Sequence, residues 1–496
     1  MKLKELMKSA TDAVWTRLDS DKEIPDVEIT GIAMDSRKVV PGAFFVATRG
    51  EFANGHHFLR QVVAAGAAAV AGTDINSLAA CNAPIAFLVE NERRALAHMS
   101  NAFYGFPSKN LNIVGITGTN GKTTIAHLVE RLHAGLGEPT ARIGTLGVKI
   151  GDELISMPYT TPEAPELQEY LRRIADSGIK SVAMEISSHG LAQDRSLGVR
   201  CPVAVFTNLT QDHLDFHRSM DDYFAAKIKL FTEYEPRDGW AVINNDDPKG
   251  RYLIDVTKRR VITYGLKEAD LRATDIVGTP SGLSFRLIHN GESREVRAKL
   301  AGIFNVYNSL AALGALLAEG VPLSDTIPIL EALTGAPGRF EPVDEGQDFR
   351  VVVDYAHTPD ALTNVLRAAR SVTPNGRVLC VFGCGGDRDA GKRPLMGSAA
   401  VNGADLAFVT SDNPRSEDPD AIIAQILTGM NGASNYTCIP NRQSAIIEAV
   451  NAARPGDTLV LAGKGHEDYQ ILATGKIHFD DREVARQALK DRGYTR

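Results

Sequence analysis

A strand, a glycine-rich turn and a helix follow one another without a break in "LNIVGITGTNGKTTIAHLVERL", residues 111–132. The apolar run before the turn has the composition of a buried parallel strand, and a helical pattern begins at Thr123. Backbone N–H groups and the helix dipole at such a junction attract phosphate. The segment therefore predicts an α/β domain with an anion site at the start of a helix.

The spacing of this turn differs from that of the common phosphate loop, G-x-x-x-x-G-K-[ST]. Lys122 follows Gly121, but the residue five positions before Gly121 is Ile116, and the other glycine is Gly118. An ordinary glycine-rich turn is the alternative, but the preceding strand and the G-K-T-T at the helix start favour phosphate binding. Lys122 would place its charge at the β- and γ-phosphates, and Thr123 would ligate Mg²⁺.

Length, charge and cysteine content exclude several classes of protein. The 496 residues suffice for about three domains. A net charge of -7 argues against general nucleic-acid binding, which needs a basic surface. The five cysteines are scattered, which favours reduced thiols over a zinc site. Because no signal-peptide segment and no apolar run of roughly 20 residues is present, we expect a cytoplasmic protein without membrane insertion.

Turn-rich segments at 104–110 ("YGFPSKN") and 333–343 ("LTGAPGRFEPV") suggest two boundaries, and hence domains 1–109, 110–335 and 336–496. The first has short β-like runs and an Ala-rich helical stretch, which predicts a small mixed α/β domain. The second continues in strand and helix units, which predicts a P-loop-type ATPase domain with a parallel sheet, and residues 269–300 alternate like an antiparallel ribbon. The third alternates strands and helices throughout, which predicts a Rossmann-like, doubly wound sheet.

Motifs along the whole chain resemble one enzyme family. T-G-T-N-G-K-T-T (117–124) is similar to the ATP loop of the Mur ligases and folylpolyglutamate synthetases. Other segments of the central domain resemble Mur ligase motifs, namely "YTTP" (159–162), "MEISSHGLAQDR" (184–195), "FTNLTQDHLDFH" (206–217) and "DDYFAAKIKLF" (221–231). So do segments of the other two domains, namely "MDSRKVVPGAFFVA" (34–47), "DYAHTPDAL" (354–362), "GCGGDRDAGKRPLM" (383–396), "SDNPRSEDP" (411–419) and "AGKGHEDYQ" (462–470).

The resemblance implies an ATP-dependent amide ligase of peptidoglycan precursor synthesis. Its carboxylate substrate would be UDP-N-acetylmuramoyl-L-Ala-D-Glu, and its amine would be meso-2,6-diaminopimelate. The γ-phosphate of ATP would convert the carboxylate into an acyl phosphate, the amine would attack, and phosphate would leave. Such chemistry depends on positioning and on charge neutralisation rather than on protein covalent chemistry.

The resemblance also implies a magnesium site. Thr123, Glu185 and His213 would be ligands, and the family lysine at the position of Lys227 reacts with CO₂ to give a carbamate that ligates a second Mg²⁺. A solvated helix lysine is the alternative. Carbamylation needs a neutral amine, so we expect the surroundings to lower the pKa of Lys227. With Lys122, these residues form the expected catalytic set: Lys122, Glu185, His213 and Lys227.

The other family positions fall into three groups. ATP would contact Gly118, Thr119, Asn120, Gly121, Lys122, Thr123, Thr124, Asn305, Asn308, Arg339 and Asp354, with His357 nearby. The UDP-dipeptide would contact Ser36, Thr160, Thr161, Ser187, Gln193 and Arg195, with Arg37 beside Ser36 at the uridine end. Diaminopimelate would contact Arg388, Asp412, Asn413, Pro414, Arg415, Gly463 and Glu467.

The D-N-P-R segment at 412–415 bears on the choice of amino acid. Its residues are typical of a turn, and we expect Pro414 to be the first residue of a helix. Arginine can also clamp a carboxylate through two N–H groups. Family members that add diaminopimelate carry D-N-P-R, whereas lysine-adding members differ at the arginine. Arg415 on the far carboxylate and Glu467 on the far ammonium would make lysine a poor substrate.

Two other functions stay open on the sequence. A folylpolyglutamate synthetase would share the phosphate loop but has no role for a uridine-type N-terminal domain or for D-N-P-R. A nucleotide-binding regulatory ATPase would need only the loop. Phosphate release from such a regulator would not depend on both a carboxylate and an amine co-substrate. We further expect small-molecule partners only, a monomer, and closure of the domains over the acyl phosphate.

Overall fold

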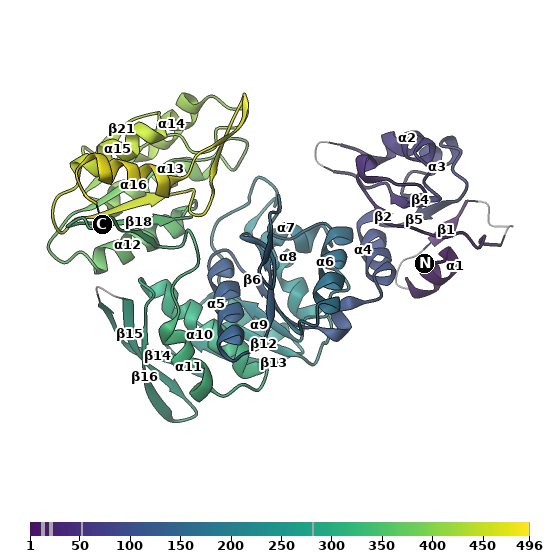
Figure 1. Ribbon diagram of the computed structural model, residues 1–496, viewed down its shortest axis with the longest axis horizontal. Coiled ribbons are helices and arrows are strands. Elements are labelled where there is room, and N and C mark those ends of the chain that lie inside the picture. The colour runs from purple at the N-terminus through teal and green to yellow at the C-terminus, as the bar shows by residue number, and fades with distance from the viewer. Residues whose placement is uncertain (11–14, 19–22, 51–52, 280–281, 496) are drawn as a thin grey trace.

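The computed structural model describes residues 1–10, 15–18, 23–50, 53–279 and 282–495. Its elements form three α/β units in chain order, and Figure 1 shows the central unit between the N-terminal and C-terminal units. Within the described part of the chain, no helix is both long and apolar enough to cross a membrane.

The N-terminal unit contains a five-stranded sheet in the order β1-β5-β4-β3-β2, parallel except for β1 against β5. Buried side chains of α1 and α4 cover one face, and those of α2 and α3 cover the other. The strands are β1 Trp15–Arg17, β2 Ile32–Ala33, β3 Phe44–Val46, β4 Ala69–Gly72 and β5 Ala86–Val89. The helices are α1 Leu3–Ser9, α2 Leu59–Ala64, α3 Ile75–Ala80 and α4 Glu92–Phe103.

The central unit contains an eleven-stranded sheet in the order β16-β15-β14-β13-β12-β11-β6-β10-β7-β8-β9. The strands from β7 to β14 in this order pair in parallel, and the two ends of the sheet are antiparallel. The strands are β6 Asn112–Thr117, β7 Thr140–Gly144, β8 Gly147–Ile150, β9 Glu153–Ile155, β10 Ser181–Glu185, β11 Val203–Phe206, β12 Trp240–Asn244, β13 Arg260–Gly265, β14 Leu271–Thr279, β15 Gly282–His289 and β16 Glu292–Ala298. The helices are α5 Lys122–Gly135, α6 Ala164–Asp176, α7 Ser188–Ala192, α8 Met220–Thr232, α9 Pro248–Val256, α10 Ile303–Ala318 and α11 Leu323–Ala332.

Apolar side chains on both faces of β6 explain why this strand reads as a continuous hydrophobic run. Val114 and Ile116 pack with α5 and α10, whereas Ile113 packs with α6 and α8. β6 lies between β10 and β11, and parallel strands end at the same edge of a sheet. The phosphate loop after β6 therefore meets the residues that follow its two neighbours.

The C-terminal unit contains a six-stranded sheet in the order β17-β18-β22-β19-β20-β21, parallel except for β17. Helices α12–α14 cover one face, and α15 and α16 cover the other, as expected for a doubly wound fold. The strands are β17 Glu341–Val343, β18 Arg350–Asp354, β19 Val378–Phe382, β20 Leu406–Val409, β21 Tyr436–Cys438 and β22 Thr458–Ala462, with a hairpin of β23 Tyr469–Leu472 and β24 Gly475–His478. The helices are α12 Pro359–Ser371, α13 Lys392–Gly403, α14 Pro419–Leu427, α15 Arg442–Ala452 and α16 Asp481–Asp491.

The predicted fold class is confirmed, including the parallel central sheet, the antiparallel ribbon of β14–β16 and the doubly wound C-terminal sheet. The helix after the phosphate loop begins one residue earlier than predicted, at Lys122. β8 and β9 extend the central sheet beyond β7, and neither strand was predicted from the sequence.

Candidate active site

The glycine loop connects the end of β6 to the start of α5. Gly118 and Gly121 have φ angles of 144° and 91°. A Cβ at Gly118 would lie 1.8 Å from Thr207 Oγ1, and one at Gly121 would lie 2.5 Å from Asn308 Oδ1. Only glycine fits both positions, which lets the backbone pass close to its neighbours and to a bound anion.

Lys122 starts α5 and folds back over this loop. Its Nζ donates to the carbonyl oxygens of Gly118 at 3.0 Å and Thr119 at 2.8 Å. Burial lowers the pKa of Lys122, although the nearby carboxylates of Glu185 and Asp212 oppose that change. The cation is thus held at the loop, where nucleotide phosphates would bind.

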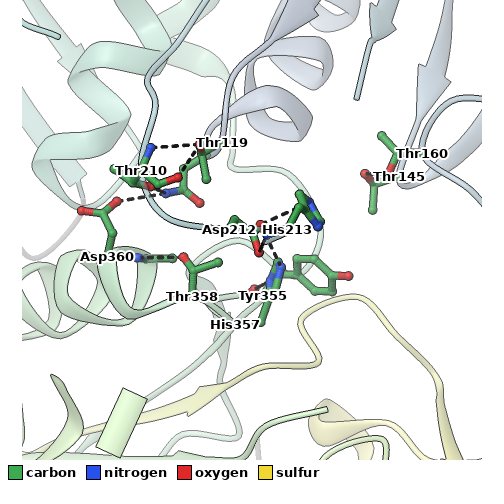
Figure 2. Close-up of polar contacts among 12 residues, drawn as sticks. Thr119, Thr145, Thr160, Thr210, Asp212, His213, Tyr355, His357, Thr358 and Asp360 are labelled. Carbon is green, nitrogen blue, oxygen red and sulfur yellow. Dashed lines mark hydrogen bonds and ion pairs between the residues drawn. The ribbon is translucent and has the colours of Figure 1, made fainter. Parts of the chain in front are cut away.

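Glu185 places a fully buried carboxylate beside the loop, at the end of β10. It accepts hydrogen bonds from Thr123 Oγ1 at 2.9 Å and from the Thr145 N–H at 2.8 Å. Thr145 also contacts Thr160 through their hydroxyls at 3.1 Å, as Figure 2 shows. The predicted magnesium ligands Thr123 and Glu185 are therefore adjacent.

Lys227 approaches the loop from α8 and is only 1% exposed. Its Nζ donates to the Gly118 carbonyl at 2.7 Å and lies 4.3 Å from the centre of the Tyr223 ring. Burial, together with the charge of Lys122, holds the pKa of Lys227 well below its ordinary value. The pKa of Lys227 is therefore shifted in the direction that carbamylation requires, towards the neutral amine.

His213 lies in the loop after β11, with a left-handed backbone at φ 55°. Its Nε2 is 3.2 Å from Asp212 Oδ2, and His357 Nε2 of the C-terminal unit is 3.9 Å from the same oxygen. Figure 2 shows Asp212 between the two histidines. Burial holds the pKa of His213 well below its usual value, which leaves a neutral ring suited to a metal.

The donor set can be tested for its fit to magnesium. Across the described residues, no three His, Cys, Asp or Glu side chains are grouped closely enough to hold a metal ion. Glu185 with the Thr123 hydroxyl supplies oxygen ligands of the kind Mg²⁺ prefers. Beside His213 stands the Asp212 carboxylate, whose Oδ2 lies 3.2 Å from Nε2, and a carbamate on Lys227 would add a further oxygen ligand. The residues therefore fit Mg²⁺ at Thr123 and Glu185, and a carbamate would complete the oxygen ligands near His213.

Arg339 brings the C-terminal unit to the phosphate loop. Its Nη2 donates to Thr123 Oγ1 at 3.1 Å, and its guanidinium lies over the Tyr355 ring at 4.6 Å. Asp354, at the end of β18, accepts from the Phe340 N–H at 2.7 Å, and burial raises the pKa of its carboxyl group. The expected contact of Asp354 with ribose stays a prediction.

The remaining residues expected at the nucleotide lie at or near the loop. Asn308 on α10 faces Gly121 and donates to Asn305 Oδ1 at 2.9 Å. Asn120 donates to Asp360 Oδ2 of α12 at 2.9 Å, which is a second link between the central and C-terminal units. Thr124 is buried in the first turn of α5.

The residues expected to bind the dipeptide form one hydrogen-bonded cluster. Thr161 Oγ1 donates to the Glu185 carbonyl at 3.1 Å and contacts Ser187 Oγ at 3.2 Å. Arg195 donates to the Thr161 carbonyl at 3.0 Å and to Gln193 Oε1 at 2.9 and 2.6 Å. The cluster thus lies directly beside the carboxylate that borders the phosphate loop.

The two residues expected at uridine lie in the N-terminal unit, in the 3₁₀ helix Ser36–Lys38. Arg37 is exposed and pairs with Asp35 at 2.7 Å. The neighbouring Lys38 pairs with Glu166 at the start of α6. This helix is therefore held near the central unit at α6.

The residues expected to bind diaminopimelate gather at the ends of β20 and β22. Asn413 Nδ2 donates to Glu467 Oε2 at 2.9 Å, and the fully buried Lys464 donates to Asn413 Oδ1 and Glu467 Oε2, both at 3.2 Å. Gly463 packs against Asp412, where a Cβ would lie 2.7 Å from Oδ2. Burial and Asp412 raise the pKa of Glu467 despite Lys464.

Arg415 lies beside this cluster and has a left-handed backbone, at φ 53°. Its Nη1 donates to the Gly386 carbonyl at 2.7 Å. Arg388 is exposed, two residues beyond Gly386, and donates to the Asp387 carbonyl at 2.8 Å. The two arginines therefore come from adjacent loops after β19 and β20.

The prediction that Pro414 opens a helix is wrong. The next helix, α14, begins at Pro419, and Asp418 caps it by accepting from the Asp420 N–H. Asp412 to Arg415 lie in the loop that precedes it. The pair Asp418–Pro419 supplies the helix start because its aspartate makes the cap, whereas the left-handed Arg415 cannot continue a helix.

Models of Mur ligase domains match three parts of the chain. "Mur ligase family, catalytic domain" matches residues 28–104, "Mur ligase middle domain" matches 116–316, and "Mur ligase, glutamate ligase domain" matches 338–465. A protein of Geobacillus thermodenitrificans is 45% identical over 499 residues, which cover 99% of this chain and 100% of that protein. The chain belongs to the Mur ligase family.

Other relatives agree over nearly the full length. The Geobacillus protein is named UDP-N-acetylmuramoyl-L-alanyl-D-glutamate–2,6-diaminopimelate ligase, and a Bacillus cereus protein of that name is 46% identical, covering 95% of this chain and 96% of that protein. A solved structure of a ligase of the same name is 34% identical, with a TM-score of 0.68, and the match covers 97% of this chain and 100% of that one. The three-unit architecture is that of the Mur ligases.

Sequence reasoning missed three residues that contact this Mur ligase's candidate site. Thr145 holds Glu185, Asp212 lies between His213 and His357, and Lys464 lies within the acidic cluster. Asp212 and Lys464 fall within motifs already noted, so their proximity to predicted residues was a usable signal. Thr145 lies in a turn with no such signal.

Proposed function

We propose that this Mur ligase is an ADP-forming ligase that uses ATP to join meso-2,6-diaminopimelate to the D-Glu of UDP-N-acetylmuramoyl-L-Ala-D-Glu, in cytoplasmic peptidoglycan precursor synthesis. The observation that carries the proposal is the match to diaminopimelate ligases along essentially the entire chain, at 45% and 46% identity. A folylpolyglutamate synthetase or a regulatory ATPase would not account for that match.

The phosphoryl transfer needs two anions, the γ-phosphate and the D-Glu carboxylate, to approach one another. Lys122 lies on the loop, and Arg339 reaches it from the C-terminal unit. These cations would neutralise the charge that builds up on the transferred group. Attack by the amine on the acyl phosphate then forms the amide bond and releases phosphate.

Magnesium, when bound, would shield the phosphates and the carboxylate from one another. Thr123 and Glu185 would hold one ion, and His213 with a carbamate on Lys227 would hold a second. To form the carbamate, the neutral Lys227 amine attacks CO₂, a bond between nitrogen and carbon forms, and one amine proton leaves to solvent. The amine is thereby converted into an anionic oxygen ligand, which the neighbouring Lys122 cation favours.

The two organic substrates would bind on opposite sides of the phosphate loop. The UDP-dipeptide would extend from Ser36 in the N-terminal unit to the cluster of Thr160, Thr161, Ser187, Gln193 and Arg195. Diaminopimelate would bind in the C-terminal unit, its far carboxylate on Arg415 and its far ammonium on Glu467, with Arg388, Asp412, Asn413, Pro414 and Gly463 around them. We keep the division into domains 1–109, 110–335 and 336–496, and a monomeric state, as parts of this proposal.

Phosphate release tests the proposal directly. The assay contains ATP, Mg²⁺ and UDP-N-acetylmuramoyl-L-Ala-D-Glu, with meso-diaminopimelate, L-lysine or no amine. Release only with diaminopimelate is the expected result. Equal release with lysine would support a ligase but contradict its specificity for diaminopimelate. Release that does not depend on an amine would contradict the ligase function itself.

A further inference from the structure

Glu163 joins two arginines that lie far apart in the sequence. Its Oε2 accepts from Arg93 Nη1 of α4, in the N-terminal unit, at 2.6 Å. Its Oε1 is 3.1 Å from Arg195 Nε, in the central unit. Glu163 stands at the N-cap of α6, but its side chain makes no cap hydrogen bond, so both oxygens are directed to the arginines.

Arg195 is held on several sides by this arrangement. Besides the Glu163 ion pair, its Nη1 donates to the Thr161 carbonyl, its Nε and Nη2 donate to Gln193, and it lies 4.7 Å from the Tyr159 ring centre. Within the described residues these hydrogen bonds use one N–H on each nitrogen, which leaves one on each terminal nitrogen for a further acceptor. The guanidinium is therefore fixed in position yet still able to bind a carboxylate.

We propose that Glu163 is a positioning residue for the peptide-bearing substrate: it orients Arg195 and ties that arginine to Arg93 of the N-terminal unit. This inference rests on the proposed function, because Arg195 is there assigned to the dipeptide. Glu163 itself need not touch the substrate. Through Glu163, the position of the N-terminal unit, which would bind uridine, would help to determine the position of Arg195, which would bind the peptide end of the same substrate.

Burial and charge support this role. The side chains of Arg93, Glu163 and Arg195 are 16%, 15% and 9% exposed, so water screens their charges little and removal of the carboxylate would leave two guanidinium groups near each other. The Lys38–Glu166 pair also joins the two units, but its side chains are 62% and 33% exposed. Among the described residues Glu166 makes no hydrogen bond or ion pair with Arg195, and its charge acts on that arginine only through space. Glu166 therefore offers a matched control.

The test compares steady-state kinetics of the full-length enzyme with those of Glu163→Gln, Glu163→Asp, Arg93→Gln, the double variant of Arg93→Gln with Glu163→Gln, and Glu166→Gln. For Glu163→Gln we expect the KM for the UDP-dipeptide to rise roughly tenfold, the effect of losing one charge-assisted hydrogen bond, while the KM for ATP and kcat stay near wild type. Glu163→Asp should recover part of the loss. Arg93→Gln should give a smaller rise that does not add to that of Glu163→Gln, since both act through one chain of contacts. Glu166→Gln should match wild type.

Three results would overturn the proposal. They are an unchanged KM for the UDP-dipeptide in Glu163→Gln, a rise in KM for all substrates together, and the same rise in Glu166→Gln. If Glu163→Gln does not fold, as judged by thermal unfolding, the non-additivity test is replaced by Arg93→Gln alone, where an unchanged KM for the UDP-dipeptide overturns the link. Failure of the proposed function would appear differently, as absence of amine-dependent turnover in the wild type.

Discussion

Lys227 shows how an interior lysine becomes reactive. A charged ammonium at 1% exposure beside Lys122 is unfavourable, because the interior offers little solvation and the second cation repels it. The lowered pKa of Lys227 favours the neutral amine that reaction with CO₂ requires. The neighbouring Lys229 on α8 instead pairs with Asp194 at 3.3 Å and is a quarter exposed.

Replacing each lysine in turn should therefore distinguish the role of Lys227 from that of Lys229. Lys227→Ala is expected to lower kcat by about 100-fold or more, the scale of losing one group that stabilises transition-state charge. Nuclear magnetic resonance with isotopically labelled bicarbonate should show a carbamate carbon in wild type and in Lys229→Ala, but not in Lys227→Ala. A fully active wild type without that resonance would contradict the carbamate.

Arg415 is the residue on which amino-acid choice should depend. In Arg415→Gln the kcat/KM for meso-diaminopimelate is expected to fall about 100-fold, since a hydrogen-bonded ion pair with the far carboxylate is lost. L-Lysine has no such carboxylate, so its slow reaction should change little and serves as the internal control. Equal losses for both amines would assign Arg415 a structural role.

Among the elements, α5 and α10 are joined at their C-terminal ends by a buried histidine. His133 Nδ1 is 2.7 Å from Glu138 Oε2, and its Nε2 is 3.0 Å from Glu319 Oε2. Burial alone would lower the pKa of His133, but the ion pairs with Glu319 and Glu138 outweigh it and raise the pKa above its usual value. The charged ring also suits the last turn of α5.

This bridge predicts a pH dependence of stability. Because the folded-state pKa of His133 is raised, its contribution is complete below the unfolded value of about 6.5 and is lost as pH rises through the folded value. The free energy of unfolding should fall across that range in wild type, and by much less in His133→Gln. Denaturant unfolding over pH measures this, with exposed His57→Gln as control. An unchanged slope in His133→Gln would contradict the assignment.

At the level of the whole molecule, the site is complete only where the central and C-terminal units meet. The contacts of Asn120 with Asp360 and of Thr123 with Arg339 bring the two units together at the phosphate loop. An acyl phosphate there must be protected from water, which closure of the units would achieve.

Closure should be visible by small-angle X-ray scattering. The radius of gyration is expected to decrease when a non-hydrolysable ATP analogue, the UDP-dipeptide and diaminopimelate are added together, because each binds a different unit. Asp360→Ala should weaken the change by removing one link between the units. Identical scattering profiles for the free and fully liganded enzyme would argue against closure.

Features that depend on residues adjacent in the chain could be predicted from the sequence alone. The apolar strand, the two glycines and the helix start specify the phosphate loop, and the alternation of strands and helices specifies the parallel sheets, because each depends on residues adjacent in the chain. The D-N-P-R segment marks the limit of such reasoning. Pro414 and Pro419 are both candidates for the start of the next helix, and the helix begins at Pro419, where Asp418 makes the cap.

Contacts between residues that are far apart in the sequence could be identified only from the tertiary structure. Nothing in the sequence links Glu163 with Arg93 and Arg195, Asp212 with His357, or His133 with Glu319. The strength of these polar contacts, and their effect on pKa values, depend on distance and on exclusion of water. Both quantities exist only after the sheets have packed, so the chain order that identifies the family does not reveal them.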